Sequence, residues 1–147
     1  MRAQLSLDLL FAVTLIMLTV VSLINLSNQE IMGAKTFDKQ TRLKVFAIDL
    51  RDTVTKAYSA GPGFSVRKDF PIPLAGSDVV TVTLNATSNM LKVDALISGR
   101  RYVTYESIPV PVKRTTTVQI IPGRTSLWVV VGLDSSGERY VEIREAP

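Results

Sequence analysis

The side chains that most often carry out catalysis or bind transition metals are missing from this sequence. The chain of 147 residues contains no cysteine and no histidine. That excludes disulfides, thiolate metal sites and cysteine nucleophiles, and it removes the commonest general base. The carboxylates left for acid–base chemistry, such as Asp69, Asp78, Asp94 and Glu106, form no recognisable catalytic pair. We therefore expect no catalytic residues, no cofactor and no metal site, and a structural or binding role.

The charge pattern gives little support for nucleic-acid binding. The net charge is +4, and the basic residues are scattered apart from the small clusters Arg100-Arg101 and Lys113-Arg114. Aromatic residues make up only 7% of the chain and are not interleaved with a basic stripe. We expect no nucleic-acid partner.

One carboxylate, Asp8, lies inside an apolar segment that runs from Leu5 to Leu26. A helix of this length covers roughly 30 Å, the thickness of a bilayer core, and Arg2 places its N-terminus on the cytoplasmic side. An ionised aspartate costs about 2.5–3.5 kcal/mol at mid-bilayer and less near the edge. Asp8 therefore either reaches the headgroups or has a partner that offsets this cost.

The helical pattern continues beyond the apolar segment and then stops. Apolar residues recur at steps of three and four from Leu43 onward, which predicts an amphipathic helix packed on a domain. We expect Asp52 and Lys56 to form an i,i+4 ion pair, and Gly61-Pro62-Gly63 to end the helix. The predicted buried stripe consists of Leu43, Phe46, Ala47, Leu50, Val54 and Tyr58.

The C-terminal half predicts a small β domain. A proline-containing linker over residues 61–76 precedes about six alternating segments with hairpin spacing. Pro109 and Pro111 suit an edge strand, and Trp128 is expected to be a core or helix-facing anchor. The predicted fold class is α+β: a long N-terminal α-helix, transmembrane and then amphipathic, followed by an antiparallel β-sheet or β-sandwich.

The N-terminal residues carry a family resemblance. Arg2-Ala3 is followed by Gln4-Leu5-Ser6-Leu7-Asp8 and then bulky apolar residues, which resembles the class III signal peptide of archaeal type IV pilin-like proteins. The resemblance implies cleavage by a membrane peptidase between Ala3 and Gln4, with Ser6 in peptidase recognition or close helix packing. Most members of the family have Glu where Asp8 stands, and Gly is common where Ala3 stands.

The resemblance implies a domain plan and a function. The chain would be a major or minor pilin of an extracellular filament, made as a precursor in the cytoplasmic membrane and then assembled at the cell surface. Its partners would be copies of itself or related pilins, a prepilin peptidase and a membrane assembly platform. The implied segments are a leader (1–3), a transmembrane or filament-core helix (4–28), an amphipathic extension (29–60), a linker (61–76) and a β head domain (77–147).

The same resemblance gives Asp8 a partner. Cleavage creates an α-amino group on Gln4 with a reference pKa near 7.7–8.0, and the carboxylate of one subunit can pair with the amine of its neighbour. Such a buried pair would fix the axial register between subunits. The expected helix–helix packing residues are Leu7, Leu10, Phe11, Leu15 and Leu18.

The sequence leaves three functional hypotheses and two candidate glycosylation sites open. The first hypothesis is the filament subunit, the second is a membrane-anchored extracellular binding module that never polymerises, and the third is an enzyme that uses the surface carboxylates named above. Asn85-Ala86-Thr87 is a glycosylation sequon at an expected strand end. Asn25-Leu26-Ser27 also fits the pattern, but it would lie at the membrane edge or in a filament core.

Overall fold

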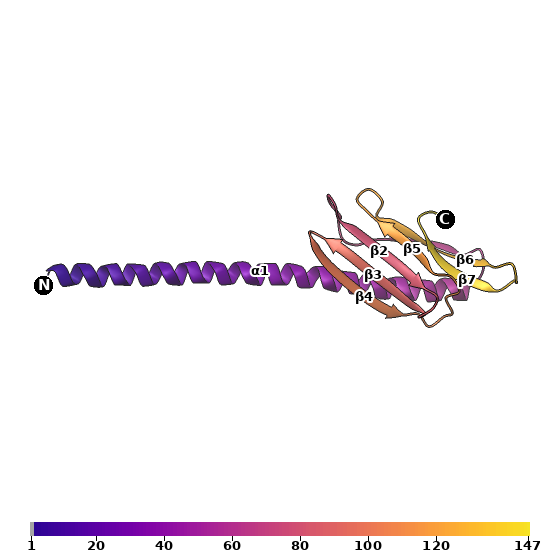
Figure 1. Cartoon of the computed structure of the whole chain (residues 1–147), viewed down its shortest axis with the longest axis horizontal. Coiled ribbons are helices and arrows are strands. Elements are labelled where there is room, and N and C mark those ends of the chain that lie inside the picture. Colours follow the sequence, from indigo (N-terminus) through magenta and orange to yellow (C-terminus); the bar gives the residue numbers. More distant parts are fainter. Residues whose placement is uncertain (1) are drawn as a thin grey trace. The chain divides into compact units, whose positions relative to one another are not determined.

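A computed structural model describes the backbone of residues 2–147 and the side chains of residues 7–147. The chain forms two compact units, one ending at Asp38 and one covering Lys39–Pro147. Helix α1 (Arg2–Ala60) belongs to both units (Figure 1). The single long helix expected from the sequence is therefore present, and it is followed by antiparallel strands, which confirms the α+β fold class.

Helix α1 ends where the sequence predicts. Gly61 follows the last helical residue with φ of +101° and donates its N–H to the carbonyl oxygen of Ala57 at 3.2 Å. Glycine tolerates this left-handed conformation because it has no Cβ, and the hydrogen bond satisfies a free carbonyl at the helix end.

Seven strands make two antiparallel sheets in the second unit (Figure 1). The three-stranded sheet has the order β1-β6-β7 and the four-stranded sheet the order β4-β3-β2-β5. Strand β4 lies at a sheet edge and ends before Pro109, as the prolines predict. The strands are β1 (Ser65–Asp69), β2 (Val79–Asn85), β3 (Met90–Ile97), β4 (Arg100–Ser107), β5 (Thr116–Ile120), β6 (Ser126–Leu133) and β7 (Arg139–Arg144).

The stretch 61–76 does more than link two halves. It contains β1, which pairs with β6 from Ser65↔Val130 to Asp69↔Ser126. It also contributes Phe70 and Ile72 to the hydrophobic core. The expectation of a plain linker is wrong here because "SVRKD" is mostly polar, as an edge strand with one solvent-facing side can be, and so lacks the apolar alternation of a strand.

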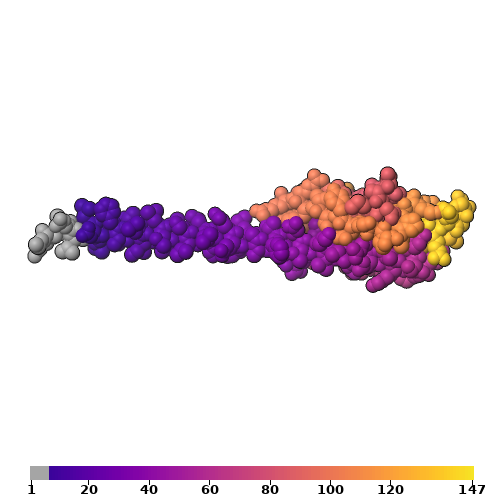
Figure 2. Space-filling view, turned by 90° about the horizontal axis from the view of Figure 1, so that it is seen from below, coloured from indigo at the N-terminus to yellow at the C-terminus, as the bar shows by residue number. Residues whose placement is uncertain are grey.

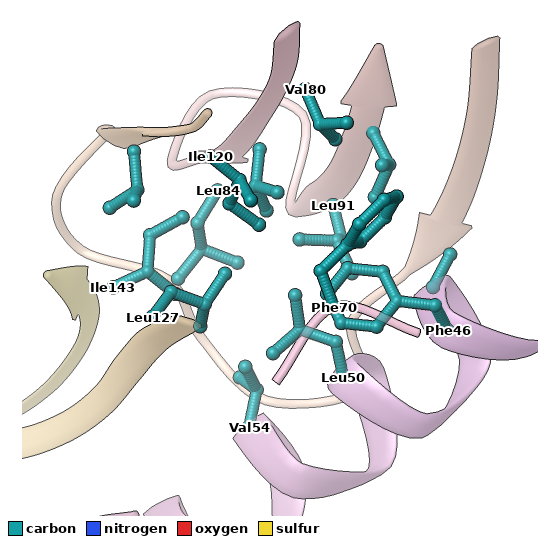
Figure 3. Close-up of a cluster of buried hydrophobic side chains, with 14 of the residues drawn as sticks. Phe46, Leu50, Val54, Phe70, Val80, Leu84, Leu91, Ile120, Leu127 and Ile143 are labelled. Atoms are coloured by element: carbon teal, nitrogen blue, oxygen red, sulfur yellow. The ribbon is translucent and has the colours of Figure 1, made fainter. Parts of the chain in front are cut away.

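The core of the second unit combines one face of α1 with both sheets (Figure 3). The predicted stripe is confirmed: Leu43, Phe46, Ala47, Leu50 and Val54 are at most 4% exposed, and Tyr58 packs partly buried against the same core. The rings of Phe46 and Phe70 meet edge to face with centroids 5.1 Å apart, a preferred aromatic geometry.

Ion pairs connect the polar side of α1, at residues 44–52, to strand β4. Glu106, a buried residue on β4, lies 2.5 Å from the Lys44 ammonium and 3.4 Å from the Arg51 guanidinium. Asp52 pairs with the adjacent Arg51 at 2.8 Å, so the expected Asp52–Lys56 pair is wrong. Arg51 lies between the carboxylates of Asp52 and Glu106, and it binds Asp52 in place of Lys56.

Trp128 is not a core residue. Its neighbours Leu127 and Val129 are fully buried in the core, and strand alternation turns Trp128 to the other face of β6. There it is half-buried and lies across from Arg67 and Arg144 in the strand register. The expectation of a core or helix-facing anchor is therefore wrong.

Candidate functional site

The candidate site is the apolar part of α1 itself. Every residue from Leu7 to Lys35 has an exposed side chain, and the apolar side chains occur on all sides of the helix. Figure 2 shows the surface of this segment in indigo and purple. The expected packing residues Leu7, Leu10, Phe11, Leu15 and Leu18 are 56–68% exposed.

This segment has the length and composition of a membrane span. Within Leu7–Ala60 an 18-residue window has a mean hydropathy of 2.5, and none of that window is buried by the rest of the chain. The burial of such a surface is worth about 25 cal/mol per Å². The segment therefore requires an apolar environment that the chain does not supply.

Three hydroxyl groups in this segment are satisfied by the helix that carries them. Thr14, Thr19 and Ser22 each donate to the carbonyl oxygen four residues earlier, at 2.8–2.9 Å. Because these polar groups need no external partner, they are compatible with either lipid or a packed helix on the outside.

Asp8 differs from these hydroxyls. It is exposed, and it has no hydrogen-bond or ion-pair partner among the residues whose side chains the structure describes. Thr19 and Ser22 follow it by eleven and fourteen positions, close to three and four turns of 3.6 residues, so all three lie on one face of α1. This shared face follows from the spacing in the sequence alone, although it is absent from the expectations above.

The structure does not describe the side chains of the residues expected to take part in processing. Ala3, Gln4 and Ser6 lie within the bounds of α1, but their side chains lie outside the described residues. The register pair between Gln4 and Asp8 is likewise outside what the structure describes.

The four carboxylates considered for catalysis have separate structural contacts. Arg101 binds Asp94 through two hydrogen bonds of 2.9 and 2.6 Å and, with Lys92 at 3.0 Å, holds the pKa of Asp94 far below its ordinary 3.8. The backbone N–H groups of Ser98 and Ala75 lower the pKa of Asp78. Asp69 pairs with Arg67, and Glu106 has the contacts given above.

Metal binding finds no support in the same part of the chain. Among the residues that the structure describes, no group of three or more acidic side chains is arranged to hold a metal ion. Asp94 instead connects β3 to β4 through Arg101, Asp78 accepts a hydrogen bond from the N–H of Ser98 after β3, and Asp69 pairs within β1.

The basic clusters are engaged within the domain. Arg101 binds Asp94, Lys113 pairs with Glu138, and the Arg114 guanidinium lies 4.3 Å from the centre of the Tyr140 ring. Arg101, Lys113 and Arg114 therefore each have a partner within the domain.

The sequon asparagine lies at a strand end, as expected. Asn85 is the last residue of β2 and is half-buried. Its side-chain oxygen accepts hydrogen bonds from the N–H groups of Thr87 at 2.8 Å and Ser88 at 3.1 Å. In the other sequon, Asn25 is exposed on α1.

The fold and the site define a class: an α+β protein whose N-terminal helix is long and apolar enough to cross a membrane and continues into an antiparallel β domain. The chain matches no family model, no curated protein and no solved structure.

Proposed function

We propose that this chain is a structural subunit of a type IV pilus-like extracellular filament, held in the membrane before assembly and polymerised through the apolar part of α1. The observation that carries the proposal is Asp8, an exposed carboxylate without a described partner in an otherwise apolar segment of α1, in which the hydroxyl groups of Thr14, Thr19 and Ser22 are satisfied. A plain lipid anchor has no use for such a group, whereas an assembly of identical helices can pair it.

The physical argument depends on what surrounds the helix. In lipid the apolar side chains are satisfied, but Asp8 carries an insertion cost. In a bundle of identical helices the same side chains pack against one another, and dispersion and exclusion of water replace lipid contact. The carboxylate can then meet the amine that cleavage creates on Gln4 of a neighbouring copy, and each charge offsets the desolvation of the other.

The face shared by Asp8, Thr19 and Ser22 supports a helix partner over lipid alone. Small and hydroxylated residues on one face allow helices to approach closely, which is common where helices associate in membranes. The rest of the helix surface has large aliphatic side chains that suit either environment.

The competing function is a membrane-anchored extracellular binding module that does not polymerise. The apolar helix and the β domain favour it equally, since both proteins need a membrane segment and a folded head. The two functions differ in cleavage and in assembly, and each difference can be measured.

The first experiment is mass spectrometry of the N-terminal peptide from cell-surface protein. The filament subunit is expected to begin at Gln4, either as a free amine or as the cyclised form, and to be recovered in the sheared surface fraction. A cyclised end would carry no charge and would contradict the pairing with Asp8, although not the cleavage. A mature chain that keeps Met1-Arg2-Ala3 and stays with the membrane would support the anchored module.

The second experiment tests Asp8 directly. Asp8→Ala is expected to lower the yield of sheared filament at least tenfold while leaving the thermal unfolding of residues 39–147 unchanged, and Asp8→Glu is expected to retain assembly. Glu30→Gln is the matched control, because Glu30 is an exposed acid on the same helix outside the apolar segment. Wild-type filament yield from Asp8→Ala would refute the register role.

A glycan on Asn85 is a secondary part of the proposal. The residue is at a strand end, beside the turn that its own side chain organises. Mass spectrometry of the tryptic peptide from surface-derived protein should reveal a glycan mass that is absent in Asn85→Gln. An unmodified peptide from assembled filaments would remove this part without affecting the rest.

A further inference from the structure

Gly33 has no steric reason to be glycine. It is the only glycine in the 59 residues of α1, and a Cβ added there would meet nothing within 4 Å. Glycine in a helix interior is less favourable than alanine because it has more conformational freedom to lose and leaves the backbone open to water. Packing within the described chain therefore does not account for it.

The residues around Gly33 receive little support from the rest of the chain. Ile31, Met32 and Phe37 are 50–72% exposed, and the buried stripe of α1 begins only at Leu43. Toward the N-terminus, Ser27 and Asn28 are weak helix formers. The exposed apolar side chains of Ile31, Met32 and Phe37 therefore add no core packing to this part of the helix.

A side-chain hydrogen bond marks the same turn. The hydroxyl of Thr36 donates to the carbonyl oxygen of Met32 at 2.9 Å, across Gly33. Hydroxyl groups that bond back to the preceding turn slightly weaken and often bend helices. Six other described hydroxyl groups of α1 make the same bond, so this turn is set apart by the coincidence of such a bond with a glycine that has no packing role.

We propose that Gly33 is a built-in bending point of α1, at which the helix opens and recloses. A change of helix direction at this turn then costs little free energy. The inference concerns the single chain and does not depend on polymerisation, so it can hold even where the proposed filament function fails.

The bend has a use for any chain with this plan. An apolar segment must follow the direction set by its lipid or helix neighbours, while residues 43–60 are fixed by their own domain. A flexible turn between the two removes the need for one rigid rod to satisfy both constraints. Alanine at this position would make the rod stiffer without adding any contact.

The test uses the absence of cysteine in the chain. Val21→Cys and Val45→Cys change two exposed side chains, 56% and 60% exposed, and carry spin labels for pulsed distance measurement on the full chain in detergent micelles. A straight helix separates these positions by about 36 Å along its axis. Wild type is expected to give a broad distribution with a population shorter than this separation.

Two further variants make the test specific to glycine. Gly33→Ala should narrow the distribution toward a single distance near the straight-helix value, and Gly33→Ala/Ala34→Gly should broaden it again. Amide hydrogen exchange around residue 33 should slow about fivefold in Gly33→Ala, as the difference in helix propensity predicts. Asn28→Ala, which adds helix propensity without removing glycine, should change the distribution less.

The result that would overturn the inference is equally direct. If wild type gives a single narrow distance that Gly33→Ala does not change, and the exchange rates match, then Gly33 is not a bending point. The distances are measured on samples shown to be monomeric in detergent by light scattering, so neither result depends on cleavage or filament formation.

Discussion

The two parts of helix α1 differ in what they do with apolar side chains. In residues 7–26 the large apolar side chains are 44–68% exposed, whereas the stripe from Leu43 to Ala57 is at most 4% exposed. Both parts belong to one continuous α-helix. What differs is the arrangement of apolar residues: they surround the first part and occupy one face of the second.

That difference in arrangement sets the partner of each part. A helix with one apolar face can be satisfied by a single neighbouring surface, and the β domain supplies it. A helix that is apolar on all sides has no such solution within a small chain and needs lipid or several other helices. The same secondary structure therefore stabilises the domain in one region and leaves an apolar surface uncovered in the other.

The largest effect is expected from the same substitution made in both regions. Leu50→Ala should lower the free energy of unfolding of the β domain by about 2–5 kcal/mol, because Leu50 is fully buried and its loss leaves a cavity. Leu15→Ala, at a 64% exposed position, should leave that free energy unchanged. Chemical denaturation followed by Trp128 fluorescence measures the free energy of unfolding of both variants. Equal losses in Leu50→Ala and Leu15→Ala would contradict the difference between the two regions.

A second prediction concerns a polar clamp found in the β domain. Asn89 donates to the carbonyl oxygens of Ile108 and Val110 at 2.7 and 2.9 Å and accepts from the N–H of Val112 at 2.8 Å. Asn89→Ala should cost about 2–3 kcal/mol, since three hydrogen bonds are lost. Asn89 also has φ of +54°, so Asn89→Gly should cost less than Asn89→Ala. Equal denaturation midpoints for the two variants would show that the backbone conformation adds nothing.

A third prediction contrasts a glycine in each region. A Cβ at Gly132 would lie 2.6 Å from the Tyr140 ring, so Gly132→Ala should destabilise the domain by about 1–2 kcal/mol. Gly33→Ala meets no atom and should leave domain unfolding unchanged. The double variant Gly132→Ala/Tyr140→Ala should lose less than the sum of its single changes. Additive losses in thermal melts would contradict a clash with Tyr140.

The smallest expected effect is the pH dependence of domain stability that Asp94 contributes. The pKa of Asp94 is lowered in the folded state, so its contribution is present above the unfolded value of 3.8 and is lost as the pH falls below it toward the folded value. Asp94→Asn should cost about 1 kcal/mol near neutral pH and less at low pH. Asp69→Asn, in an exposed pair with Arg67, is the control and should change stability by under about 0.5 kcal/mol. Parallel pH profiles for wild type and Asp94→Asn would refute this.

The sequence predicted the helix and most strands because their signals are local. The periodicity of apolar residues predicted the buried stripe of α1, and the glycines and proline at residues 61–63 predicted the end of the helix. The alternation of apolar and polar residues predicted the strands after residue 76. It failed where the outcome depended on neighbours: β1 is mostly polar and is recognised only by its pairing with β6. For the candidate site, the apolar segment and Asp8 could be found from sequence, while the lack of an intrachain partner could not.

Residue pattern alone determined that one long helix would begin the chain, that its apolar character would change from all-round to one-sided, and that strands would follow. These properties depend on each residue and its near neighbours along the chain. The tertiary structure decided which carboxylates are held by arginine or backbone groups, that Trp128 faces away from the core, and that Arg51 rather than Lys56 binds Asp52. Such outcomes depend on which face of each strand the core covers and on which charged groups lie near one another: Arg51, which adjoins Asp52 in sequence, also contacts Glu106 on β4.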